Sequence, residues 1–256
     1  MLLFSFAVFT LGFCSYTAFS VEPEGNSSKS YLNNYEGNIG DGRRIRMTLV
    51  FSGDKVEGVY VYADELQDRW LKGVISEGNN LHLDELNAKK EKIAIFNASL
   101  GDSNPSSYDI FLPEKIVGYW QKFGDSTQYP FEISLEGSTS GTLSHRYSVA
   151  GADDDKLIHD KALRFQTAVK NRDKETVANL INFPIKVDID GKRRTIREKK
   201  KFIALYDKIF TEKYRARILN AIPRHMFVKY TGIMLGGRGE VWFGDDGTVI
   251  ALNNED

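Results

Sequence analysis

The sequence has a single cysteine, Cys14, and it lies in the charge-free apolar stretch 1–19. One cysteine closes no internal disulfide and builds no zinc site of cysteine ligands. If this stretch is removed, the remaining chain has no thiol nucleophile either. The folded protein must therefore be stabilised by the packing of side chains rather than by disulfide cross-links.

The sequence also has no excess of positive or negative charge. Lys and Arg number 34, Asp and Glu number 35, and the formal net charge is −1. This balance leaves room for local patches, but it argues against a nucleic-acid partner that is recognised through the whole surface. The chain has 256 residues, of which 41% are hydrophobic, so it can bury a core in one large or two modest domains.

Motifs that carry a known chemistry are scarce. The run 137–141 resembles G-x-S-x-G, but its central residue is Thr139 and no strand-to-helix turn surrounds it. The run 236–239 lacks the G-x-G-x-x-G spacing, and the sequence contains no P-loop. None of the histidines stands in an H-E-x-x-H spacing; they are His82, His145, His159 and His225. The sequence therefore predicts no catalytic set, no metal site and no cofactor, and it disfavours an enzyme.

The stretch 1–19 has the features of a secretory signal peptide. Its apolar core is short, small residues stand at Ala18 and Ser20, and the polar run 22–28 follows directly. Cleavage near Ser20 would place the protein in the periplasm or outside the cell. Two alternatives stay open, because the stretch nearly reaches the ~20 residues of a membrane anchor and because Cys14 could be a lipidated cysteine, although the residue before it is bulky.

Residues 35–136 alternate between apolar and polar side chains, and turn residues interrupt this pattern at short intervals. The strands 45–51 and 56–62, joined by a short turn, form the clearest hairpin. About eight strands without a long helix between them predict an antiparallel β meander or a small barrel. The small polar residues of 137–141 are expected to begin a linker that reaches residue 154.

The spacing of apolar residues changes from two to about 3.6 after residue 154, which predicts helices in the C-terminal part. The clearest amphipathic helix covers 197–210, and an Asp190-Gly191 turn ends the strand before it. Helices first and strands later predict an α+β domain over 155–254. The expected elements are helices from 155, at 174–181 and at 197–210, and strands at 185–189, 226–230, 239–243 and 248–252.

Four segments of the C-terminal part carry a resemblance to a known family; they are 183–185, 202–210, 232–236 and 239–243. With the order of the predicted elements, they resemble exported bacterial proteins with a nuclear transport factor 2-like domain. This resemblance implies a cone in which a curved antiparallel sheet wraps a helix and leaves a pocket. Residues 35–136, through the segments 35–40 and 118–120, similarly resemble small β-barrel domains of bacterial envelope proteins.

Ketosteroid isomerases and dehydratases of this family place Asp, Tyr or His groups in the cone, where burial tunes their pKa values. The resemblance thus implies four candidate pocket residues here, namely Asp188, Tyr206, His225 and Tyr230. Tyr206 also fits a core position of the 197–210 helix, and His225 fits a surface position at a strand end. An open pocket that holds Asp188, Tyr206 and His225 together would favour an enzyme or a small-ligand carrier, and a filled interior would reject it.

A local concentration of positive charge is hidden by the neutral total. The basic residues are Lys192, Arg193, Arg194, Arg197, Lys199, Lys200 and Lys201, over one turn and the start of a helix. Positive charge at a helix N-terminus opposes the helix dipole, which favours a role in contact with an anionic group. Such a group could belong to an acidic protein, to the phosphates of an envelope polymer or to lipid headgroups, and a solvated surface without a partner is the ordinary alternative.

The leading hypothesis is an exported envelope protein that acts by binding another protein. Its more specific form is an inhibitor or immunity protein that masks a toxin or a cell-wall enzyme. An enzyme or small-ligand carrier that uses the pocket of the C-terminal cone is the alternative, and attachment to anionic envelope components is a third hypothesis.

Overall fold

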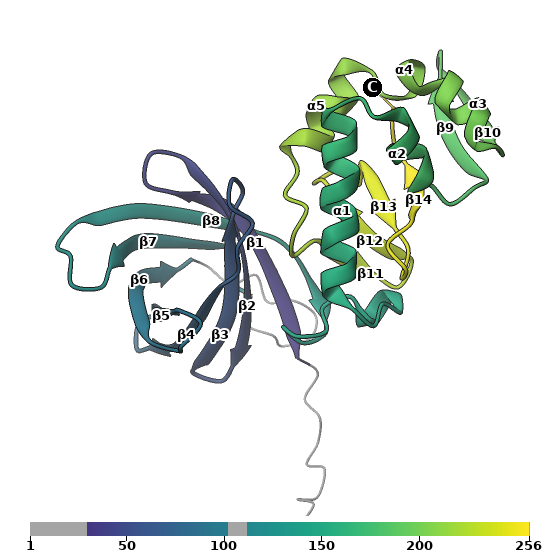
Figure 1. Cartoon of the computed structure of the whole chain (residues 1–256). Coiled ribbons are helices and arrows are strands. Elements are labelled where there is room, and N and C mark those ends of the chain that lie inside the picture. The colour runs from purple at the N-terminus through teal and green to yellow at the C-terminus, as the bar shows by residue number, and fades with distance from the viewer. Residues whose placement is uncertain (1–29, 102–111, 256) are drawn as a thin grey trace, which may run out of the picture.

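The computed structural model describes residues 30–101 and 112–255, and the predicted signal peptide lies outside them. Within the described residues, an N-terminal β-barrel precedes a C-terminal part in which helices pack on a small sheet (Figure 1). The chain is therefore mixed α+β with more strand than helix. None of the described helices is long and apolar enough to cross a membrane.

The barrel is closed and fully antiparallel. Each strand pairs with the next along the chain, and β1 pairs with β8. The structure thus confirms the antiparallel barrel that the alternating pattern predicts. Its strands are β1 (Tyr31–Ile39), β2 (Arg43–Ser52), β3 (Lys55–Tyr62), β4 (Arg69–Ser76), β5 (Asn80–Leu86), β6 (Lys92–Leu100), β7 (Lys115–Lys122) and β8 (Gln128–Ser140).

Residues 137–140 belong to the barrel, so the expectation that a linker begins at residue 137 is wrong. Gly137 pairs with Asn34 and Ser140 pairs with Tyr31, which extends β8 along β1. Main-chain hydrogen bonds between strands do not depend on the size or polarity of the side chains. A segment of small polar residues can therefore continue a strand when a neighbouring strand is in place.

Aromatic side chains fill the middle of the barrel. Tyr60 on β3, Phe96 on β6 and Phe131 on β8 are buried, and their rings meet edge to face at centroid distances of 5.4 and 5.0 Å. This geometry suits the charge distribution of aromatic rings. Most inward positions of the alternating strands thus supply an apolar core.

A polar cluster interrupts this core at Glu85, an inward residue of β5 that is fully buried. Its carboxylate accepts hydrogen bonds from the Tyr60 hydroxyl at 2.7 Å, from Trp120 Nε1 at 2.9 Å and from Arg69 Nη1 at 2.9 Å. Burial raises the pKa of Tyr60, and the negative charge of Glu85 raises it further. The hydroxyl therefore keeps its proton and acts as a donor.

Three inward glycines allow the barrel strands to approach closely. A Cβ atom at Gly73 on β4 would lie 1.8 Å from the His82 carbonyl oxygen of β5. The corresponding distances are 1.9 Å at Gly37 to Glu132 O and 2.0 Å at Gly118 to Asn97 O. These atoms are backbone atoms of neighbouring strands and cannot turn aside, so a side chain at these positions must distort the barrel.

We expect Gly73→Ala to destabilise the protein by about 1–3 kcal/mol, as overpacking does in well-packed cores. Gly237→Ala is the matched control, because a Cβ there meets no atom within 4 Å and should change stability by less than about 0.5 kcal/mol. Urea unfolding of both variants measures the difference. Equal stability of the two variants would contradict the close approach of β4 and β5.

The C-terminal part contains five α-helices, a two-stranded sheet and a four-stranded sheet among the described residues. The four strands β11 to β14 follow one another in order, and α1 lies across this sheet in Figure 1. The helices are α1 (Asp155–Lys170), α2 (Lys174–Asn179), α3 (Lys199–Ala204), α4 (Tyr206–Ile209) and α5 (Glu212–Asn220). The strands are β9 (Ile185–Ile189), β10 (Lys192–Ile196), β11 (Phe227–Lys229), β12 (Gly232–Leu235), β13 (Val241–Phe243) and β14 (Val249–Leu252).

The helix predicted over 197–210 is two short helices, α3 and α4, which meet at Leu205. The helix α5 has no counterpart among the predicted elements. This helix begins at Thr211, whose side-chain oxygen accepts a hydrogen bond from the Tyr214 N–H at 3.2 Å. A threonine cap followed by an acidic residue is a recognisable helix start, so the signal for α5 was present in the sequence.

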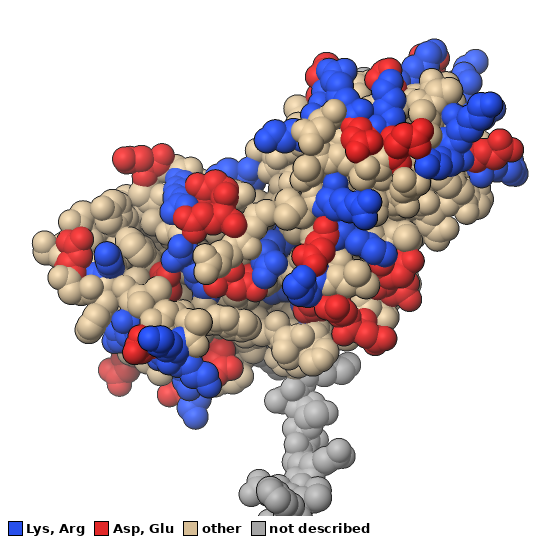
Figure 2. Space-filling model, viewed as in Figure 1, with Lys and Arg blue, Asp and Glu red and all other residues tan. Residues whose placement is uncertain are grey.

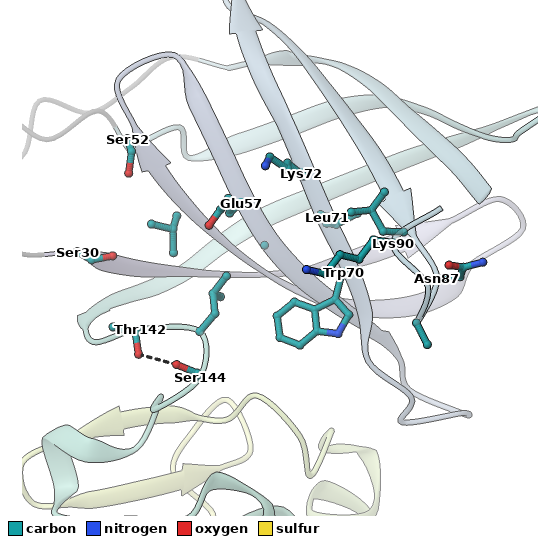
Figure 3. A pocket seen from close by; sticks show the side chains of 15 residues that line it. Ser30, Ser52, Glu57, Trp70, Leu71, Lys72, Asn87, Lys90, Thr142 and Ser144 are labelled. Carbon is teal, nitrogen blue, oxygen red and sulfur yellow. Dashed lines mark hydrogen bonds between the residues drawn. The ribbon is translucent and has the colours of Figure 1, made fainter. Parts of the chain in front are cut away.

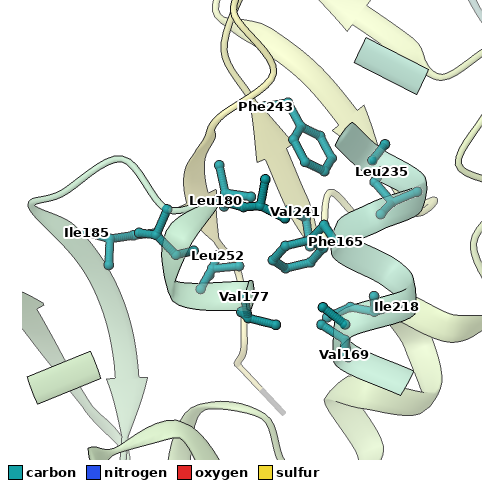
Figure 4. Close-up of a cluster of buried hydrophobic side chains, with 14 of the residues drawn as sticks. Phe165, Val169, Val177, Leu180, Ile185, Ile218, Leu235, Val241, Phe243 and Leu252 are labelled. Atoms are coloured by element: carbon teal, nitrogen blue, oxygen red, sulfur yellow. The ribbon is translucent and has the colours of Figure 1, made fainter. Parts of the chain in front are cut away.

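Apolar side chains occupy the interior of the C-terminal part. Phe165 of α1 packs edge to face against Phe243 of β13 at 5.9 Å. Figure 4 shows side chains from α1, α2, α5 and the strands converging on the same interior. They include Val169, Val177, Leu180, Ile185, Ile218, Leu235, Val241 and Leu252, all of them buried.

Buried arginines join the barrel to the C-terminal part. Arg46 of β2 contacts Glu36 and donates from Nη1 to the carbonyls of Ile222 and Arg224, at 3.1 and 3.3 Å. Arg146, between β8 and α1, donates to Asn34 Oδ1 and Thr48 Oγ1, both at 2.8 Å. Its side chain is almost fully buried. These contacts hold the C-terminal part against the barrel.

Candidate functional site

The predicted basic residues lie on the hairpin of β9 and β10 and on the start of α3. Asp190 and Gly191 form the hairpin turn with φ values of 54° and 70°, which an Asp-Gly pair adopts readily. In the described part of the chain, β10 pairs with β9 alone. β10 is therefore an edge strand, and its residues 192–195 are exposed while Ile196 is buried.

The opposite side of the hairpin is fastened to the rest of the protein. The Asp188 N–H donates to Asn254 Oδ1 at 2.8 Å, and Asn254 Nδ2 donates to the Asp188 carbonyl at 2.7 Å. The same Nδ2 donates to the Ile209 carbonyl at 3.2 Å. Ile185, Val187 and Ile189 of β9 are buried. These contacts attach the hairpin through β9 and leave the β10 edge outward.

We call the seven basic residues from Lys192 to Lys201 the basic edge. Arg193 pairs with Asp188, and Lys199 Nζ lies 2.8 Å from Glu175 Oε2. The side chains of the remaining five form no hydrogen bond or ion pair with another described residue; they are Lys192, Arg194, Arg197, Lys200 and Lys201. Figure 2 shows Lys and Arg side chains, with some acidic ones between them, at the end of the molecule where Figure 1 places α3 and β10.

The four candidate pocket residues do not form one site. Asp188 pairs with Arg193 on the hairpin. Tyr206 is buried in the core and stacked on Phe210 at 4.6 Å, and burial raises the pKa of Tyr206 to about 12. Tyr230 is 84% exposed between β11 and β12.

His225 is not at the surface position that its place at a strand end predicts. It is 5% exposed and faces the barrel. Its Nε2 atom is 2.6 Å from Asp68 Oδ1, in the loop between β3 and β4. Arg224 Nε donates to the same carboxylate oxygen at 2.7 Å. The described contacts of His225 include neither Asp188 nor Tyr206, so the grouping of these three residues that would favour an enzyme or a ligand carrier is not seen among the described contacts.

A second buried cluster lies around His225, and no sequence pattern predicts it. The Tyr147 hydroxyl and His159 Nε2 are 2.8 Å apart, and the same hydroxyl accepts from the Met226 N–H at 2.9 Å. His159 Nε2 also accepts from the His225 N–H at 3.2 Å. Residues so distant in sequence give no local signal, because only the packing of α1 against the loop after α5, which contacts the barrel through Asp68, brings them together.

The imidazole rings of His159 and His225 stay neutral because they are buried near positive charge. Burial, together with the nearby positive charge of Arg146, lowers the pKa of His159 to about 2 and that of His225 to about 4. Burial by itself would raise the pKa of Asp68, but hydrogen bonds from His225 and Arg224 outweigh it and hold this pKa well below its usual range.

The cluster has little capacity for catalysis. Both acceptor groups are already occupied, because the Asp68 carboxylate receives three hydrogen bonds and His159 Nε2 receives two. The described residues also contain no group of three His, Cys, Asp or Glu side chains placed to hold a metal ion. The cluster therefore acts as a polar contact between the barrel and the C-terminal part.

The chain matches no family model, and no curated protein and no solved structure is significantly similar to it.

Proposed function

We propose that the protein is an exported bacterial envelope protein that binds an acidic partner protein through the basic edge. The observation that carries this proposal is the exposed strand β10, which presents unpaired cations beside a free strand edge. An edge strand offers main-chain donors and acceptors to a partner, and side chains along it supply specificity.

The positive charge of the basic edge exceeds what the fold needs. Charged side chains on an edge strand prevent unwanted pairing with other chains, and Lys192 to Arg194 would serve that purpose alone. Arg197 and the three lysines at residues 199–201 continue the patch onto α3, whose Glu198 cap makes no side-chain hydrogen bond. Cations in the first turn oppose the helix dipole, at about 0.3–1 kcal/mol each. A destabilising charge on an exposed surface favours a role in recognition.

The more specific form of the proposal is an inhibitor or immunity protein that masks a toxin or a cell-wall enzyme. The apolar start of the sequence supports export, with cleavage near Ser20. The order of α1, α2, the β9–β10 hairpin, further helices and four strands supports a nuclear transport factor 2-like relationship for the C-terminal part. The closed barrel supports the likeness to small envelope barrels, although one fold serves many functions.

An enzyme or ligand carrier that uses a C-terminal pocket is the weaker alternative. Apolar side chains converge on the interior between α1 and the sheet (Figure 4). Asp188, Tyr206 and His225 have separate surroundings, which leaves this alternative without a group of polar residues to act on a ligand.

Reversing charges on the basic edge tests the proposal. We expect the triple variant Arg194→Glu, Arg197→Glu, Lys200→Glu to lose an acidic protein that the wild-type protein captures from an envelope extract. A matched variant with the same net charge, Lys55→Glu, Lys89→Glu, Lys122→Glu, changes exposed barrel lysines and should capture the partner as the wild type does. Capture should also weaken as salt rises, because exposed charges are screened.

Two results would count against the proposal. Equal capture by both triple variants would exclude the basic edge as the docking surface. Binding of anionic lipid vesicles or of a phosphate-bearing polymer, lost only in the 194/197/200 variant and without a captured protein, would replace the partner protein by an anionic surface.

A further inference from the structure

A groove of about 870 Å³ runs along the outer wall of the barrel. Its floor is the outward face of β2, β3 and β4, and residues 142–144 form one side (Figure 3). The turn between β5 and β6, with Asn87 and Lys90, forms the other side. Its size lies within the range of pockets that hold small ligands, about 300–1,000 Å³.

Trp70 of β4 is the main apolar surface in the groove. Its side chain projects from the barrel wall towards Thr142 and Ser144 (Figure 3). The residue is 44% exposed, although tryptophan is usually well buried. A rigid aromatic ring left exposed in a concave surface marks a site for a ligand that has an apolar face.

Three charged side chains share the groove with Trp70. Glu57 of β3 and Lys72 of β4 stand opposite each other in the strand register, and Lys90 lies in the turn between β5 and β6. The side chains of these three residues form no hydrogen bond or ion pair with another described residue. The groove therefore offers two ammonium groups and one carboxylate to a ligand, which leaves an excess of one positive charge.

The floor of the groove disfavours an extended peptide. The barrel is closed, so β2, β3 and β4 each use their main-chain groups on both neighbouring strands. A peptide in the groove would find no free strand edge, and its own main-chain groups would lose water without gaining partners. A nucleic acid is disfavoured too, because its many phosphates require more cations than this groove contains.

We propose that this groove binds a short oligosaccharide that carries a carboxylate. A sugar ring has an apolar face that can stack on Trp70 and hydroxyl groups that can hydrogen-bond to Glu57 and Ser52. Its carboxylate pairs with Lys72 or Lys90. Residues 153–155, which are acidic, line a neighbouring cleft that also touches Trp70, so the carboxylate lies on the side of the two lysines.

This site is separate from the basic edge, and it neither needs nor excludes a protein partner there. Titration calorimetry with trigalacturonic acid as the probe tests it on the purified protein. We expect measurable binding that weakens at least tenfold in Trp70→Ala and about threefold to tenfold in Lys72→Gln. Trp70→Phe should retain part of the affinity, and Tyr230→Ala, which removes an exposed aromatic ring elsewhere, should retain all of it.

Two further probes separate ring stacking from simple charge attraction. Cellotriose, which has sugar rings without carboxylates, should bind more weakly than trigalacturonic acid, and triglutamate, which has carboxylates without sugar rings, should not bind. The proposal is overturned if trigalacturonic acid does not bind to the wild type, if Trp70→Ala binds it equally well, or if triglutamate binds as tightly. Thermal unfolding followed by circular dichroism shows whether each variant is folded.

Discussion

Replacing Glu85 by alanine should destabilise the barrel by about 3 kcal/mol or more, because this charged residue is fully buried. The carboxylate is fully buried and accepts hydrogen bonds from Tyr60, Trp120 and Arg69. Removing one member of a buried charged pair typically costs about 3–5 kcal/mol, because the other charge loses its partner. Tyr60 and Trp120 would keep buried donors without acceptors as well, at about 1–3 kcal/mol each.

Arg69 moderates this effect. Its side chain is 26% exposed, and its second Nη atom lies 2.9 Å from Glu65. After loss of Glu85, the guanidinium can therefore turn towards Glu65 and water, which is why we place the expected loss at the lower end of the range for buried pairs.

Urea unfolding of three variants measures the contribution of Glu85. Glu85→Gln keeps an acceptor and a similar shape, so it should lose clearly less stability than Glu85→Ala. Glu77→Ala, at an exposed turn position, should stay within about 0.5 kcal/mol of the wild type. The double variant Glu85→Leu, Arg69→Leu should recover part of the loss, because apolar pairs can replace buried ion pairs. A loss below about 1 kcal/mol in Glu85→Ala would show that the hydrogen bonds around Glu85 contribute little.

In the barrel, the sequence pattern predicts the strands and their inward residues but not the contacts between distant strands. Alternation predicts the strands and, with them, which residues point inward, because a strand exposes its two faces at a period of two. The strand 81–86 reads Leu, His, Leu, Asp, Glu, Leu, which places Glu85 on the inward side with Leu81 and Leu83. The position was thus predictable, but its three donors come from β3, β4 and β7 and depend on closure of the barrel.

In the C-terminal part, too, local features are predictable from the sequence and long-range contacts are not. The strand at 185–189, its Asp190-Gly191 turn and the basic residues after it are local features, and the hairpin lies where the sequence predicts it. The helix over 197–210 was predicted too long, because its apolar spacing continues across Leu205 while the backbone does not. His159 and His225 lie at the contact with the barrel, and no local pattern identifies such a contact.

Acid should weaken the protein steeply because of these two histidines. In an unfolded chain a histidine titrates near pH 6.5, but burial lowers the pKa of His225 to about 4 and of His159 to about 2. As the pH falls below about 6.5, both histidines bind protons in the unfolded chain but stay neutral in the folded protein. The free energy of unfolding therefore has its full value above pH 6.5, and below it this free energy falls by about 1.4 kcal/mol per pH unit for each histidine.

The two histidines together should lower the free energy of unfolding by about 4 kcal/mol between pH 7 and pH 5. Asp68 does not contribute in this range. Its pKa is depressed in the folded protein, so its stabilising effect is lost only at a pH below the usual range of a carboxyl group. Urea unfolding at pH 7, 6 and 5 measures the slope.

The variant His159→Gln separates the histidine effect from a general sensitivity to acid. An amide oxygen can still accept from the Tyr147 hydroxyl and the His225 N–H, so the variant should fold with about half of the wild-type pH slope. His145→Gln changes an exposed histidine and should keep the full slope. If His159→Gln were as pH-sensitive as the wild type, the loss of stability would have to arise elsewhere than at the contact of His159 with Tyr147 and His225.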